Sequence, residues 1–181
     1  FSMESAVFSD PKKIIEQCGI QPGMIIADFG AGSGFYTIEA GKALANTGQV
    51  YAIDIQKDLL VRLKENASKE NLSNVEVIWG DIEKVNGTNI ADSSINLALI
   101  CNVLFQIEDK KTFLLELKRV LIPGGRVLVV DWADSFGGIG PHKDKIVSKE
   151  SAEKLFTGAG FAKEREISAG SHHYGLIFKK M

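Results

Sequence analysis

The feature that most constrains this chain is a short apolar run that breaks into three glycines at alternate positions. The run is Met24–Phe29, and Gly30, Gly32 and Gly34 follow it. A short apolar run is typical of a buried strand, and residues 35–44 after the glycines have the pattern of a helix. Glycine has no Cβ, so the backbone can turn sharply and lie directly against a ligand. A strand, a glycine turn and a helix in this order predict an open parallel sheet that binds a ligand at the carboxyl ends of its strands.

The glycine spacing indicates what kind of ligand the loop accepts. Dinucleotide-binding loops have the spacing G-x-G-x-x-G, with a helix N-terminus facing the pyrophosphate. Here the third glycine of that pattern would fall at Phe35 or at Thr37, depending on the glycine from which the count starts. Asp28, just before the loop, would repel a pyrophosphate and suits a cationic or amine-bearing ligand. The spacing therefore argues against a nicotinamide-dependent oxidoreductase, and an ordinary tight turn is the other alternative.

Length and composition narrow the class of protein. The 181 residues favour one domain over residues 1–181 with a single sizeable core. The formal net charge of -2 offers no broad basic surface, so a nucleic-acid substrate is not favoured. We expect no membrane span, since no apolar run is long enough. The two cysteines, Cys18 and Cys101, are too few for a disulfide framework, and a reduced, cytoplasmic protein is expected.

Two further acids stand where predicted strands end. Residues 49–54 have the pattern of a second strand and end in Asp54, whose carboxylate can accept hydrogen bonds from both hydroxyls of a ribose. Asp54 could equally cap the helix that follows. Residues 75–79 have the pattern of a third strand, after which Asp81 is either a binding residue or a turn-forming aspartate.

The segment Ala-Asp-Phe-Gly-Ala-Gly-Ser-Gly at residues 27–34 resembles the first motif of the class I methyltransferases that use S-adenosylmethionine. The resemblance implies that the glycine loop holds the methionine end of this cofactor and that Asp28 helps to place its amino group. It implies that Asp54 binds the ribose and that Asp81 reads the adenine amino group. The cofactor-binding residues implied in this way are Asp28, Phe29, Gly30, Ala31, Gly32, Gly34, Asp54, Ile55, Asp81, Ile82 and Asn102. The two isoleucines would pack on the adenine, and the product would be S-adenosylhomocysteine.

Later segments extend the resemblance over nearly the whole chain. In residues 121–132 a Pro-Gly-Gly turn precedes an apolar strand that ends in Asp-Trp, and this segment resembles the group that methylates ubiquinone and menaquinone precursors and other small molecules. Residues 161–168 and 173–179 have the pattern of strands, and they are so close in sequence that they must pair as a hairpin. The resemblance therefore implies an α/β fold: a Rossmann-like, seven-stranded, mostly parallel sheet with helices on both faces and an antiparallel C-terminal strand. Residues 1–22 would form an N-terminal helix and the segment that connects it to the rest of the chain.

The chain also departs from the family pattern. Many members carry two histidines where this chain has Phe105 and Gln106, and that difference removes a candidate base. We expect methyl transfer to a small-molecule acceptor. The alternatives are a non-catalytic S-adenosylmethionine-binding protein or partner subunit and, with less support, an RNA or protein methyltransferase. The chain has little N-terminal extension and no large insertion, so the acceptor pocket is either shallow or completed by a second subunit; a monomer or a homodimer is expected.

Residues 133–147 follow the predicted fifth strand at the edge where the methyl donor would lie. Loops at that edge commonly carry the substrate site, and the glycines of this segment suit a mobile lid. A plain surface loop is the alternative. His142 is the candidate base within it, although a solvated loop histidine explains the residue as well. His172 and His173 are adjacent on a predicted strand and point to opposite faces, so no metal site is expected.

Overall fold

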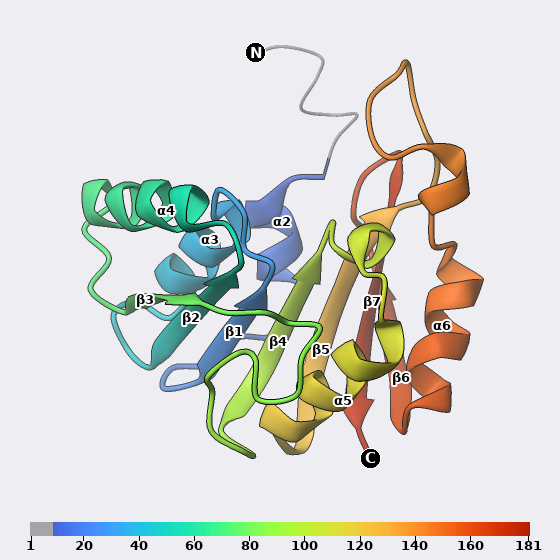
Figure 1. Cartoon of the computed structure of the whole chain (residues 1–181). Coiled ribbons are helices and arrows are strands. Elements are labelled where there is room, and N and C mark those ends of the chain that lie inside the picture. The colour runs from blue at the N-terminus through green and yellow to red at the C-terminus, as the bar shows by residue number, and fades with distance from the viewer. Residues whose placement is uncertain (1–8) are drawn as a thin grey trace.

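A computed structural model describes residues 9–181 of the chain, which form a seven-stranded sheet (Figure 1). The strand order is β3-β2-β1-β4-β5-β7-β6. Neighbouring strands from β3 to β5 pair in parallel, and β7 pairs antiparallel with both β5 and β6. This arrangement confirms the predicted fold. The strands are β1 (Ile25–Phe29), β2 (Gln49–Asp54), β3 (Val75–Trp79), β4 (Ile95–Cys101), β5 (Leu121–Trp132), β6 (Phe161–Ile167) and β7 (His173–Lys180).

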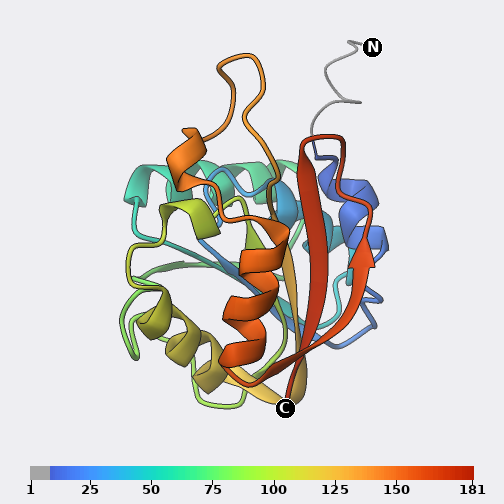
Figure 2. The ribbon, with the colours of Figure 1, turned by 90° about the vertical axis from the view of Figure 1, so that its right-hand side faces the viewer.

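Helices cover both faces of the sheet. Figure 2 shows α5 and α6 on one side and α2 and α3 on the other. Because successive strand residues point to opposite faces, the core divides in two: Ala27 packs with the α5 side, and its neighbour Ile26 packs with the α2 side. The helices are α2 (Pro11–Glu16), α3 (Phe35–Ala43), α4 (Lys57–Lys69), η1 (Leu104–Gln106), α5 (Lys110–Val120), η2 (Lys143–Lys145) and α6 (Lys149–Gly158).

The N-terminal helix of the predicted residue 1–22 segment is α2. Asp10 caps it, since its carboxylate accepts a hydrogen bond from the Lys13 amide at 3.3 Å. Residues 1–8 of the predicted segment lie outside the described residues. Within residues 9–181, no helix has the length and apolar character needed to cross a membrane.

The start of β5 differs from the sequence-based prediction, which placed a Pro-Gly-Gly turn before the strand. The pairing with β4 already begins at Leu121, opposite Ile95. It then shifts register and resumes at Arg126, opposite Leu97. The turn is therefore an irregularity within the strand, and Gly124, with φ +74°, supplies the left-handed backbone that it needs.

The connection between β3 and β4 is a loop, residues 80–94, with no helix of its own. The buried Glu116 carboxylate of α5 holds it in place. Its oxygens accept hydrogen bonds from the Asn86 amide at 2.7 Å and from the Thr88 amide and hydroxyl at 3.2 and 2.6 Å. The carboxylate also pairs with Arg119 at 2.6 Å. A single buried acid thus satisfies two backbone donors of a connection that lacks secondary structure.

Strands β1 and β4 are neighbours, although the chain leaves β1 toward β2 and then returns. The strand order therefore reverses direction between β1 and β4. Open α/β sheets bind ligands at such a switch point, outside the carboxyl ends of the strands. The glycine loop, the start of α4 and η1 all lie at this edge, and residues 133–147 rise beyond it (Figures 1 and 2).

Candidate functional site

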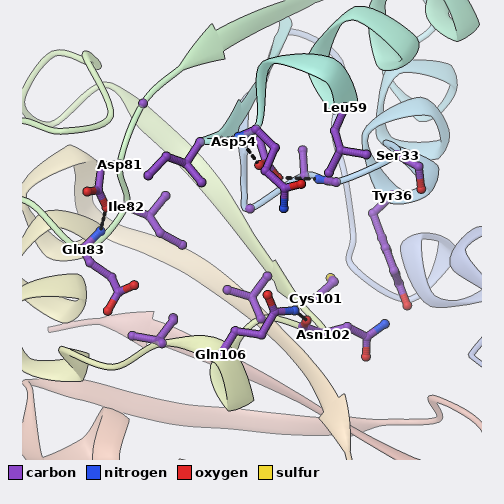
Figure 3. Close-up of a pocket in the computed structure, with 18 of the residues that line it drawn as sticks. Ser33, Tyr36, Asp54, Leu59, Asp81, Ile82, Glu83, Cys101, Asn102 and Gln106 are labelled. Carbon is purple, nitrogen blue, oxygen red and sulfur yellow. Dashed lines mark hydrogen bonds between the residues drawn. The ribbon is translucent and has the colours of Figure 1, made fainter. Parts of the chain in front are cut away.

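A cavity of about 390 Å³ opens at the switch point (Figure 3). Its wall is built from the segments that follow β1, β2, β3 and β4. Eight of the residues predicted to bind the cofactor line it: Gly30, Ala31, Gly32, Asp54, Ile55, Asp81, Ile82 and Asn102. Their role in cofactor binding stays a prediction, but the fold brings these residues from four different segments to one wall.

The glycine loop forms one side of the cavity and is tied to β2. The amides of Gly30 and Ala31 both donate to the Ile53 carbonyl at 2.9 Å. Gly30 has φ +72°, and a Cβ there would lie 2.8 Å from Val103 Cγ2. Gly32 has φ +57° with open space beside it. The loop thus requires glycine at the first position for both conformation and space, and at the second for conformation alone.

Asp54, at the end of β2, connects the glycine loop to the start of α4. Its side chain is 8% exposed, with Oδ2 accepting from the Gly32 amide and Oδ1 accepting from the Gln56 amide, each at 2.9 Å. A carboxylate has about four lone-pair sites, so each oxygen can accept one more hydrogen bond from a ligand. Ile55 follows at the mouth of the cavity and is exposed. The alternative prediction that Asp54 caps the next helix is wrong, because the N-cap of α4 is Gln56 and Asp54 only accepts from the amide of that residue.

The third side of the cavity is the segment after β3. Asp81 Oδ1 accepts from the Glu83 amide at 2.9 Å, and Oδ2 lies 3.4 Å from Lys84 Nζ. Glu83 in turn holds the start of α5, since its Oε1 accepts from the amides of Glu108 and Asp109 at 2.8 and 2.7 Å. These bonds fix the turn on which Asp81 and its apolar neighbour are presented.

At the end of the cavity opposite Asp81, the wall is formed by Tyr36 of α3 and by Cys101 and Asn102 at the end of β4 (Figure 3). Asn102 has φ +58°, its amide donates to the Val130 carbonyl at 2.8 Å, and its carbonyl accepts from Gln106 Nε2 at 3.3 Å. Cys101 is a free, buried thiol whose pKa burial raises well above its usual value, so it stays protonated. That environment does not suit a nucleophile.

Three residues of the predicted set are not on the wall. Asp28 is 2% exposed, and its Oδ2 accepts from the Thr37 hydroxyl at 2.7 Å. Burial, with a smaller contribution from the negative charge of Asp54, raises its pKa to about 7 against the lowering effect of the Thr37 bond. Phe29 is fully buried in the core, and Gly34 is the N-cap of α3 with φ +86°, where a Cβ would lie 2.4 Å from a Leu63 carbon.

The predicted lid, residues 133–147, is a loop with hydrogen bonds between its own residues. Phe136 and Ile139 form an antiparallel bridge, and the Ser135 hydroxyl donates to the Pro141 carbonyl at 2.7 Å. The His142 side chain is 78% exposed, with Nδ1 3.2 Å from Asp144 Oδ2, and it is not part of the cavity wall. Its role as a base stays a hypothesis without a contact to the cavity.

The adjacent histidines have separate surroundings. His172 Nδ1 lies 2.6 Å from Asp134 Oδ1, and its ring stacks on Phe136. The His173 ring lies 4.3 Å from that of Trp132, and burial lowers its pKa to about 4. Across the described residues there is no group of three or more histidine, cysteine or acidic side chains that could hold a metal ion.

Some residues of the cavity wall were not predicted from the sequence. In the sequence, Tyr36 is only part of the helical pattern of residues 35–44, and Gln106 is only a departure from the family pattern. Leu59 could have been found from its position one turn into the helix after Asp54. The missed lining residues are Ser33, Phe35, Tyr36, Gln56, Leu59, Gly80, Glu83, Cys101, Val103, Gln106 and Ile107.

A model of the methyltransferase domain family matches residues 20–170, and the chain belongs to this family. Among curated relatives, an arsenite methyltransferase of Halobacterium salinarum is 31% identical over 110 residues, which are 61% of this chain and 27% of the relative. A demethylmenaquinone methyltransferase of Staphylococcus aureus is 31% identical over 120 residues, which are 66% of this chain and 48% of the relative. The chain thus spans less than half the length of these curated relatives.

Solved structures share the fold over a larger part of this chain than the curated relatives match. A SAM-dependent methyltransferase from Aquifex aeolicus superposes with a TM-score of 0.87 at 27% identity, covering 96% of this chain and 91% of that one. The [4+2]-cyclase SpnF superposes with a TM-score of 0.78 at 15% identity, covering 94% of this chain and 80% of that one. Because this fold also supports a cyclase, the fold alone does not define the reaction.

Proposed function

We propose that the protein transfers a methyl group from S-adenosylmethionine to a small-molecule acceptor. The observation that carries the proposal is the geometry of Asp54. Its two oxygens are fixed by the Gly32 and Gln56 amides at the cavity wall, and each keeps a lone pair that faces no described donor. Two adjacent ribose hydroxyls are the ligand groups that such a carboxylate fits.

The remaining wall fits the rest of the cofactor. Gly32, which has open space where a Cβ would stand, leaves room for close approach of a ligand to the backbone. Ile55 and Ile82 offer apolar contacts for a planar base, and Asp81 offers an acceptor for its amino group. The acids around the cavity suit a ligand that carries positive charge. Family membership and the chemistry of these side chains thus support the same cofactor.

When bound, S-adenosylmethionine supplies a methyl group on a sulfonium, which is already a strong electrophile. The side chains of this protein therefore need mainly to orient the acceptor and to exclude water. A general base is needed only where the acceptor holds its proton tightly. The absence of histidine at Phe105 and Gln106 is compatible with an acceptor that needs no base. A non-catalytic cofactor-binding protein is the second candidate, and that same departure is what favours it.

The proposal also covers the class of acceptor, the compartment and the oligomeric state. The related arsenite and demethylmenaquinone methyltransferases are named for small acceptors, and the net charge of -2 gives no support to a nucleic-acid partner. Both cysteines are free and buried, which supports a reduced, cytoplasmic compartment. We propose a monomer or a homodimer.

The test is calorimetric titration with S-adenosylhomocysteine, with NADH as the control ligand. We expect the wild type to bind the former and not the latter. Asp54→Asn should weaken binding by about 100-fold, because the amide nitrogen cannot accept, so one hydrogen bond from the ligand is lost, and the other no longer goes to a charged group. Asp58→Asn, an exposed aspartate in the first turn of α4, is the matched control. Absence of binding by the folded wild type would reject the proposal.

A further inference from the structure

Asp131, at the end of β5, is a buried acid that lies outside the cavity wall. Its Oδ2 atom accepts a hydrogen bond from the Leu104 amide at 2.9 Å, and its Oδ1 atom accepts from the Trp132 amide at 2.8 Å. The amides of Val103 and Phe105 also stabilise its negative charge. The carboxylate thus gathers the main-chain donors at the start of η1 around the end of β5.

The segment that Asp131 holds forms one side of the cavity. Val103 packs directly on the glycine loop, since a Cβ at Gly30 would lie 2.8 Å from Val103 Cγ2. The position of this segment therefore sets both the η1 side of the cavity and a contact with the glycine loop. The side chains of the segment that line the cavity are Val103, Gln106 and Ile107 (Figure 3).

The segment depends on contacts from outside, because η1 is a single 3₁₀ turn, which is too short to be stable alone. Two acids supply these contacts. Glu83 Oε1 accepts from the amides of Glu108 and Asp109, just beyond the end of η1. Asp131 holds its start. Loss of the Asp131 carboxylate should therefore free the start of η1 and leave its far end in place.

The charge of Asp131 lowers the stability of the folded protein. Burial raises its pKa from 3.8 to about 6, against the lowering effect of the surrounding amides. The folded state therefore binds the proton more tightly than the unfolded state, and the ionised carboxylate costs stability at pH 8. A purely structural group would add stability, whereas a group that reduces it while ordering a cavity wall is typical of a functional site.

We propose that Asp131 is a positioning residue for the cavity. By binding the amides at the start of η1, it fixes Val103 against the glycine loop and sets the η1 side of the wall. It acts through the backbone of η1 and touches no ligand itself. The inference rests on the proposed function and deepens it, because this wall is one against which the cofactor would bind.

The test compares Asp131→Asn with Val129→Ala. Asparagine keeps the shape of the side chain, but it has no charge and only one acceptor atom, so it cannot hold both the Trp132 and the Leu104 amides. Val129 is fully buried on the same face of β5, two residues earlier, and its truncation is the matched control for lost packing.

Three quantities are measured at pH 8 for the wild type and both variants. Calorimetry gives the dissociation constant for S-adenosylhomocysteine. Nuclear magnetic resonance of the ligand-free protein gives the deuterium exchange rate of the Leu104 amide, relative to the amides of α5. Urea denaturation gives the midpoint of unfolding, which reports global stability.

Asp131→Asn should weaken binding of S-adenosylhomocysteine by about tenfold and speed exchange at Leu104 by about tenfold or more. Its urea midpoint should not fall, because removal of a buried charge offsets the lost hydrogen bond. Val129→Ala should lower the urea midpoint and leave both the affinity and the relative exchange at Leu104 unchanged.

Unchanged affinity of Asp131→Asn would overturn the inference, and so would weaker binding with unchanged exchange at Leu104. Equal losses of stability and affinity in Asp131→Asn and Val129→Ala would indicate a structural role and would also overturn it. If the folded wild type does not bind S-adenosylhomocysteine, the proposed function itself is rejected. The exchange measurement needs no ligand, so it tests separately whether Asp131 holds η1.

Discussion

Asp28 should destabilise the folded protein at neutral pH, and Asp28→Asn should relieve this cost. Burial raises its pKa from 3.8 to about 7. The folded state therefore binds a proton more tightly than the unfolded state, and stability falls as pH rises from about 4 to about 7. Each pKa unit corresponds to 1.36 kcal/mol, so a shift of about three units costs about 4 kcal/mol once the carboxylate is fully charged. An amide keeps the Thr37 hydrogen bond and carries no charge.

The assay is urea denaturation of wild type and Asp28→Asn at pH 5 and pH 8. The variant should be more stable by about 1–2 kcal/mol at pH 5 and by about 4 kcal/mol at pH 8. Asp131, whose pKa burial raises to about 6, also makes the wild type pH-dependent, but its contribution cancels in the difference between the two proteins. Asp58→Asn, at an exposed site, is the matched control. An equal stability difference at both pH values would refute the reasoning.

Four other substitutions test the structure. Gly34→Ala should cost about 3 kcal/mol in urea denaturation, since its φ is +86° and its Cβ would collide with Leu63, whereas Gly32→Ala, with free space, should cost only about 1 kcal/mol; equal costs would contradict the packing argument. Burial alone would raise the pKa of Glu116, but hydrogen bonds from its guanidinium and threonine partners outweigh burial and lower it to about 2. Glu116→Gln should therefore cost about 3 kcal/mol at pH 7, and the difference from wild type should shrink as pH falls below about 4.5; a constant difference would argue against the charge. His142→Ala, at an exposed site, should leave stability within about 0.5 kcal/mol and S-adenosylhomocysteine affinity unchanged, and an unchanged methylation rate once an acceptor is found would reject the base role.

The fold was predictable because the strand signals are strong and closely spaced. The apolar runs that form β1 and β4 are buried on both faces, which is the pattern of central parallel strands. The hairpin of β6 and β7 followed from the short connection between them. The register shift at the start of β5 was not predictable, because it depends on how Leu121 meets Ile95 across the sheet.

The candidate site was predictable in outline and not in detail. A motif gives the residues near a loop but not which of them face the cavity. Strand alternation turns Asp28 toward Thr37 and Phe29 into the core, so neither lines the cavity wall. Tyr36 lies within the helical pattern of residues 35–44, and only the fold shows that it lines the cavity.

The loop between β3 and β4 is fastened to both ends of α5, and this affects how the protein opens locally. Glu83 of the loop holds the first turn of α5, and Glu116 of α5 holds the loop. Regions linked in this way open as one cooperative unit. The amides of Asn86 and Thr88 should therefore exchange with deuterium at the rate of α5, rather than at the fast rate usual for loops. The wall that carries Asp81 would then be as rigid as a helix, and access for a ligand would depend on other segments.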